Sequence, residues 1–73
     1  MAHSILIVDD EVLTLNNLKR ALETEGYEIT LADSGETALE LFAKIRPNLV
    51  LLDLMLPGID GIKVLEQIKA ADR

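Results

Sequence analysis

The sequence contains no cysteine, no tryptophan and only two aromatic residues, Tyr27 and Phe42. Without cysteine the chain forms neither disulfides nor thiolate metal sites, which fits a reducing compartment, and we expect a cytoplasmic protein. No apolar run reaches membrane-spanning length, and the N-terminus lacks the charged and apolar regions of a signal peptide. Positive charge is also scarce. Seven Lys and Arg against 13 Asp and Glu give a net charge of −6, so no basic patch predicts nucleic-acid binding.

The residues that are present indicate one small globular domain. Hydrophobic residues make up 49% of the 73 positions and charged residues 27%, a composition typical of folded rather than disordered chains. A chain of this length buries only about 60% of the surface that it exposes when unfolded. We therefore expect marginal stability.

Short apolar runs alternate with helical patterns along the chain. Residues 5–8 and 49–52 are entirely apolar, which is typical of strands buried on both faces, whereas residues 27–32 alternate as a half-exposed edge strand would. The apolar stripes of the predicted helices are Leu15, Leu18 and Leu22, then Ala38, Leu41, Phe42 and Ile45, then Ile62, Leu65 and Ile68. This β-α-β-α-β-α order predicts an α/β fold with parallel strands and right-handed crossovers.

Particular residues mark the ends of these helices. Gly26 is suited to the position after the first helix, and Ser34 to the N-cap of the second. Arg46 precedes Pro47, and because the residue before proline avoids the α region, the second helix is expected to stop there. Asp60 is the expected N-cap of the third helix.

Carboxylates follow both all-apolar runs. Asp9 and Asp10 come directly after residues 5–8, and Asp53 directly after residues 49–52. If these strands are neighbours, the three carboxylates converge at the carboxyl edge of the sheet, where ligands bind in open parallel sheets. They would repel one another without a cation, and such a hard oxygen site suits Mg²⁺. A carboxylate beside Mg²⁺ can attack a phosphoryl group. The alternatives are a solvated strand end for Asp53, and helix N-terminal charge for Asp9 and Asp10.

Two motifs together identify a family. The pattern I-L-I-V-D-D-E at residues 5–11, followed by D-L-M-L-P-G-I-D-G at residues 53–61, closely resembles the receiver domain of two-component response regulators. The resemblance implies a flavodoxin-like (CheY-like) fold with three parallel strands in the order 2-1-3. It implies that Asp53 accepts a phosphoryl group from a sensor histidine kinase. Because the sequence shows no general base or binding loop beyond these acidic residues, we expect no enzyme with its own substrate, and at most a domain that catalyses its own phosphorylation. Asp9, Asp10 and Asp53, with the main-chain carbonyl of Met55, would hold Mg²⁺.

The resemblance extends over the whole chain but only over part of a receiver. Residues 1–73 correspond to a partial receiver domain that lacks the fourth and fifth β-α units. Those units carry a Ser or Thr and a Lys. None of the lysines of this chain corresponds to the family lysine, because all of them fall in predicted helices: Lys19, Lys44, Lys63 and Lys69. We therefore expect this segment to act in phosphorelay signalling with an impaired conformational switch.

A second function is a structural module without phosphotransfer, natural or engineered, that self-associates. In a three-stranded 2-1-3 sheet, residues 49–52 become an edge without charge or proline, and one sheet face is left partly uncovered. We expect a homodimer through that strand or that face.

Overall fold

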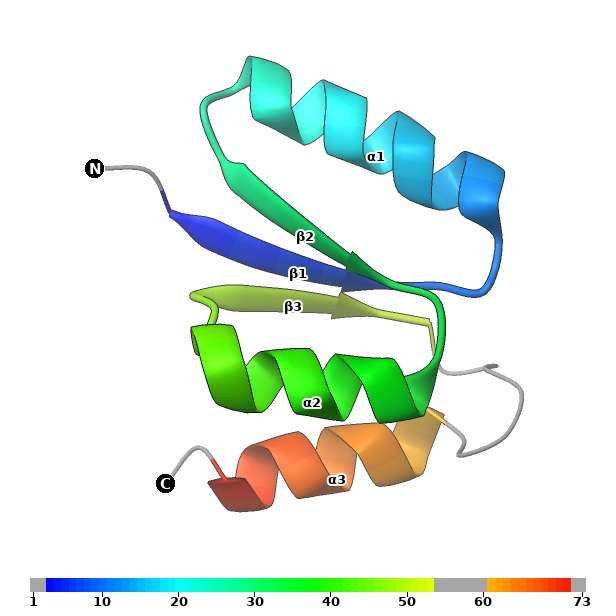
Figure 1. Ribbon diagram of the computed structural model, residues 1–73, viewed down its shortest axis with the longest axis vertical. Helices are drawn as coiled ribbons and strands as arrows, with labels where there is room; N and C mark the ends of the chain where they lie inside the picture. The colour runs from blue at the N-terminus through cyan, green and yellow to red at the C-terminus, as the bar shows by residue number, and fades with distance from the viewer. Residues whose placement is uncertain (1–2, 54–60, 72–73) are drawn as a thin grey trace.

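Three parallel strands and three helices alternate along the chain, as the sequence predicts (Figure 1). The computed structural model describes residues 3–53 and 61–71. The elements are β1 (Ser4–Val8), α1 (Val12–Thr24), β2 (Glu28–Ala32), α2 (Gly35–Ile45), β3 (Leu49–Leu52) and α3 (Gly61–Ala71). In the described part of the chain, no helix is long and apolar enough to cross a membrane.

The sheet has the order β2-β1-β3, so β1 is central and both of its neighbours run parallel to it. Val8, the last residue of β1, lies opposite Ala32 in β2 and Leu52 in β3. All four residues from Ile5 to Val8 are buried, because the central strand is covered on both faces. This confirms the 2-1-3 order and places the carboxyl ends of the three strands side by side.

The two faces of the sheet are covered unequally. Figure 1 shows α1 on one side of the sheet and α2 with α3 on the other. The larger core cluster, on the α2 and α3 side, contains Leu6, Val8, Ala32, Ala38, Phe42, Val64 and Ile68. Among the described residues, the buried cluster on the α1 side contains Ile5, Ile7 and Leu15, with the partly buried Leu22, Ile29 and Leu31 packed against it. One helix therefore covers a face of the same width that two helices share on the other side.

The helix ends follow the chemistry predicted from sequence. Ser34 is the N-cap of α2, and its hydroxyl accepts a hydrogen bond from the Thr37 N–H at 3.2 Å. Gly26, two residues after α1, has φ +92°, a conformation that costs glycine nothing and strains other residues. The C-cap of α2 is Arg46, which takes the left-handed conformation with φ 46° while its guanidinium lies 5.1 Å from the centre of the Phe42 ring. Asp60 lies outside the described residues.

The predicted stripe of α3 is wrong in two of its three positions. Val64 and Ile68 are buried against the core, whereas Ile62 is 50% exposed and Leu65 is 37% exposed. The helix also carries a second apolar stripe, Val64-Ile68, which the sequence analysis did not consider. The position of α2 decides between them, because α3 packs beside α2 rather than over the middle of the sheet.

The prediction that residues 49–52 are buried on both faces is also wrong. Val50 and Leu52 pack on the α2 and α3 side, but Leu49 is 50% exposed and Leu51 is 36% exposed. The cause is the edge position of β3 together with the placement of α1, which packs against β2. The structure agrees instead with the other expectation for residues 49–52, that of a partly uncovered apolar strand at an edge of the sheet.

Candidate functional site

Hydrogen bonds to the strands fix two carboxylate residues at the carboxyl edge of the sheet. The backbone N–H of Asp9 donates to the carbonyl of Ala32 at 3.1 Å, which extends the pairing of β1 and β2 by one residue. In the same way, the N–H of Asp53 donates to the carbonyl of Val8 at 2.9 Å. Because both bonds continue the parallel ladders around β1, Asp9 and Asp53 lie next to each other where those strands end.

The side chains of Asp9, Asp10 and Asp53, here called the acidic cluster, meet above this edge. Each offers a carboxylate oxygen, and the three oxygens lie within 4.8 Å of one another. Asp9 and Asp53 are half-buried and Asp10 is exposed. The N–H of Glu11 donates to Oδ1 of Asp9 at 3.0 Å, which orients that carboxylate. The structure thus brings together the three acids that the sequence predicts as neighbours.

Three negative charges at this spacing repel one another. For two unit charges 4.8 Å apart the repulsion is about 1 kcal/mol in bulk water, and several times larger at the effective dielectric constant of a protein surface. Carboxylate oxygens are the ligands that Mg²⁺ prefers, and an exposed third acid leaves room for the waters that Mg²⁺ retains. The donor set therefore fits a small divalent cation.

Other acids near this edge do not join the cluster. The Glu11 carboxylate accepts a hydrogen bond from the Thr14 hydroxyl within the first turn of α1. Asp33 follows β2 but belongs to no group of three potential ligands among the described residues. Met55, whose carbonyl was predicted as a further ligand, lies outside the described residues, as do Pro57 and Gly58.

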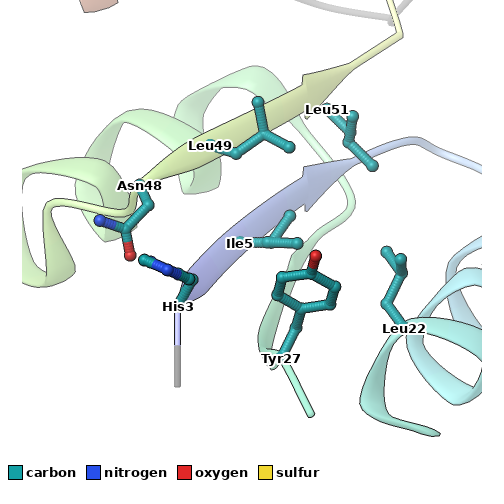
Figure 2. Close-up of a pocket in the computed structure, with 7 residues that line it drawn as sticks. All are labelled: His3, Ile5, Leu22, Tyr27, Asn48, Leu49 and Leu51. Carbon is teal, nitrogen blue, oxygen red and sulfur yellow. The ribbon is translucent and has the colours of Figure 1, made fainter. Parts of the chain in front are cut away.

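Sequence reasoning missed a second feature, an apolar groove at the opposite end of the sheet. Its volume is about 410 Å³, and Figure 2 shows its lining: His3, Ile5, Leu22, Tyr27, Asn48, Leu49 and Leu51. His3, Tyr27 and Asn48 each directly precede a strand, so the groove lies away from the acidic cluster. The only sequence signal for it was the expected loss of cover on one sheet face, since the lining comes from segments far apart in the chain.

Comparison with known proteins assigns the chain to a family. The family model described as the response regulator receiver domain matches residues 5–73. The transcriptional regulatory protein TrcR of Mycobacterium tuberculosis is 38% identical over 68 residues, which are 93% of this chain and 26% of TrcR.

Two solved structures are similar to nearly the whole of this chain. A CheY-like receiver domain protein from Methanospirillum hungatei is 35% identical with a TM-score of 0.95, over 97% of this chain and 57% of that one. The response regulator protein TrrA from Thermotoga maritima, solved in complex with Mg(2+)-BeF, is 44% identical with a TM-score of 0.90, over 97% of this chain and 61% of that one.

The chain thus spans about a quarter of that curated relative and somewhat more than half of these solved structures. Sequence motifs, strand order, the acidic cluster and these matches all agree. The chain belongs to the response regulator receiver domain family.

Proposed function

We propose that this chain acts in phosphorelay signalling, with Asp53 as the residue that accepts a phosphoryl group. The observation that carries the proposal is the acidic cluster, because its three carboxylate oxygens lie within 4.8 Å at the carboxyl edge of the sheet. Two parallel strands position Asp9 and Asp53, so the spacing is built into the sheet rather than left to a loop. The phosphodonor would be the phosphohistidine of a sensor histidine kinase. In this role the chain is a signalling domain, not an enzyme with a substrate of its own.

In the proposed reaction a carboxylate oxygen of Asp53 attacks the phosphorus atom. A P–O bond forms and the P–N bond to the donor imidazole breaks, with the electron pair returning to the ring nitrogen, which then takes a proton from water. Asp9 and Asp10, with the carbonyl of Met55, would hold Mg²⁺. Bound Mg²⁺ would neutralise charge on the phosphoryl oxygens and on the cluster. The chain's own contribution is to keep Asp53 fixed and half-buried beside the two other acids.

Beryllofluoride with Mg²⁺ tests this function directly. We expect the amide spectrum of the chain to shift on addition of both reagents, with the largest changes near Asp9 and Asp53. The Asp53→Ala variant should show no such response. Asp33→Ala is the matched control, since Asp33 is an exposed acid at the end of β2 outside the acidic cluster. Absence of any Mg²⁺-dependent response in the unmodified chain would refute the proposal.

We further propose that switching is impaired in these 73 residues. The Ser or Thr and the Lys expected from the family resemblance belong to strands that the sequence does not contain. Shifts caused by beryllofluoride should therefore stay close to the acidic cluster and not reach α2 or the far end of β3. Large shifts at Leu49 or Phe42 would contradict this.

A second candidate function is a self-associating structural module without phosphotransfer. The observation that favours it is the exposure of Leu49 and Leu51 on an edge strand. If this is the sole function, Asp53→Ala would leave the state of association unchanged, and Mg²⁺ with beryllofluoride would have no effect.

A further inference from the structure

One further acidic residue borders the acidic cluster without belonging to it. Glu11 directly follows Asp10, and its backbone N–H donates to Oδ1 of Asp9 at 3.0 Å, so its backbone contacts one of the three acids. Its carboxylate instead accepts a hydrogen bond from the Thr14 hydroxyl in the first turn of α1. The side chain of Glu11 is therefore held away from the group of carboxylates that its own backbone contacts.

The backbone of Glu11 is fixed on both sides, which leaves only its side chain able to change partner. Its N–H donates to Asp9, and its carbonyl accepts a hydrogen bond from the N–H of Leu15 at 3.1 Å. Glu11 is the N-cap of α1, but its side chain makes no capping hydrogen bond. Within the described part of the chain, the Thr14 hydroxyl is the donor that holds this exposed carboxylate.

The number of carboxylates in such a site influences which divalent cation it prefers. Mg²⁺ is small, requires octahedral geometry and keeps several waters, so it is commonly bound through few carboxylates. Ca²⁺ takes about six to eight oxygen ligands in a flexible geometry, and additional carboxylates raise its affinity. Three acids, one of them exposed, fit the smaller ion. A fourth carboxylate, from Glu11, would favour the larger one.

We propose that Thr14 determines the preference of the acidic cluster for Mg²⁺ over Ca²⁺, because its hydroxyl keeps the Glu11 carboxylate out of the site. Thr14 is a positioning residue, since it acts on the cation through Glu11. The inference rests on the proposed function, because it concerns the cation of that site, but it does not depend on phosphoryl transfer to Asp53. Loss of the hydroxyl should leave the backbone positions of Asp9 and Asp53 intact, because hydrogen bonds to the sheet hold both.

Amide chemical-shift titrations of the metal-free chain with Mg²⁺ and, separately, with Ca²⁺ test this preference. Thr14→Val removes the hydroxyl and keeps a branched side chain of similar shape. We expect the Ca²⁺ affinity to rise about fivefold, the order expected when one hydrogen bond no longer has to break, and the Mg²⁺ affinity to change less than about twofold. Because both ions carry the same charge, the ratio of the two affinities cancels the general attraction of a released carboxylate.

Three further variants separate the contact with Glu11 from a general effect on α1. Thr14→Ser keeps a hydroxyl and should keep the ratio of the unmodified chain. Thr24→Val is the matched control, since the Thr24 hydroxyl donates to the carbonyl of Arg20 at 2.9 Å at the other end of the same helix. Glu11→Ala should leave the ratio unchanged when made alone, and should cancel the gain in Ca²⁺ affinity when combined with Thr14→Val.

The side-chain carboxyl resonance of Glu11 provides a direct readout. We expect it to shift on addition of Ca²⁺ to the Thr14→Val variant, and to stay in place when Mg²⁺ is added to the unmodified chain. Circular dichroism shows whether each variant is folded. Thr14→Ala, which has the higher helix propensity, is a second variant without the hydroxyl and should show the same change in preference.

Two kinds of result would count against the proposal, and they differ in what else they overturn. An unchanged ratio in folded Thr14→Val or Thr14→Ala, or a gain that persists without the Glu11 carboxylate, would overturn the role of Thr14 and leave Asp53 as the phosphoryl acceptor. An unmodified chain that binds neither cation would overturn the proposed function together with this inference.

Discussion

At the scale of single residues, the three carboxylates of the acidic cluster repel one another, and favourable interactions elsewhere in the chain must offset this repulsion when no cation is bound. Asp10 has the least support, because it is exposed and follows the β1 ladder by two residues, whereas Asp9 and Asp53 each donate a backbone hydrogen bond into the sheet. A small domain is marginally stable, so one kcal/mol at this site is a substantial fraction of the free energy of unfolding.

Asp10→Asn should therefore stabilise the metal-free chain while it weakens cation binding. The substitution removes one charge from two repelling pairs, and we expect the free energy of unfolding to rise by about 1 kcal/mol in EDTA. Mg²⁺ should then stabilise the variant less than the unmodified chain, a difference that urea denaturation with and without 10 mM Mg²⁺ would measure. Asp33→Asn is the control and should change neither value. Equal stabilisation of both chains by Mg²⁺ would contradict a role for Asp10 in binding.

At the scale of elements, the sequence predicted the order and ends of the helices and strands well. Ser34 was identified as an N-cap because its hydroxyl can accept a bond from a neighbouring N–H, a local property that needs no knowledge of the fold. The acidic cluster was predicted for a similar reason, since parallel strands that are neighbours must end together. The buried stripe of α3 was not predictable, because Val64 and Ile62 differ little in chemistry and α2 decides which of them is covered.

Ser34→Ala should destabilise the chain by about 1 kcal/mol, because the Thr37 N–H then loses its side-chain acceptor. Ser34→Gly should cost less, since glycine leaves the N–H accessible to water. Thermal unfolding of the two variants provides the measurement. The N-cap of α1 offers a comparison: Glu11 makes no capping bond with its side chain, so Glu11→Ala should cost only a few tenths of a kcal/mol. A larger loss at Glu11 than at Ser34 would refute this assignment.

Val64→Ala distinguishes the two possible faces of α3. Val64 is fully buried in the larger core cluster, and removing its two methyl groups should cost about 2 kcal/mol in the free energy of unfolding. Ile62→Ala removes more atoms from a half-exposed position, yet it should cost less than about 0.5 kcal/mol. Urea denaturation of both variants measures the difference. A larger loss for Ile62→Ala than for Val64→Ala would mean that α3 buries the face predicted from the sequence.

At the scale of the whole molecule, stability rests on one main core of few residues. A chain of 73 residues has a total free energy of unfolding on the order of 4 to 11 kcal/mol. The α1 face contributes less, since three of the described residues are fully buried in its cluster, against seven in the cluster on the other face. Phe42 is the largest side chain in the other cluster, which also contains residues of β1, β2 and α3.

Phe42→Ala should abolish cooperative folding. The expected loss of about 3 to 5 kcal/mol is comparable with the whole stability of so small a domain. The far-ultraviolet circular dichroism of the variant should resemble that of a largely unfolded chain at 25 °C. Tyr27→Ala removes the other aromatic ring from a position 38% exposed at the groove, and this variant should remain folded. A cooperative transition in Phe42→Ala close to that of the unmodified chain would mean that the core lies elsewhere.

The ladder around β1 has a consequence for how this chain could be studied. Asp53 is held at the sheet edge by its bond to Val8, in line with the pairing of Leu52 and Val8. A slip of β3 by a single residue would turn its side chains to the opposite face and carry Asp53 away from Asp9. The affinity of the acidic cluster for a divalent cation therefore depends on the register of β3 against β1, and a titration with such a cation would report whether this register is the one described.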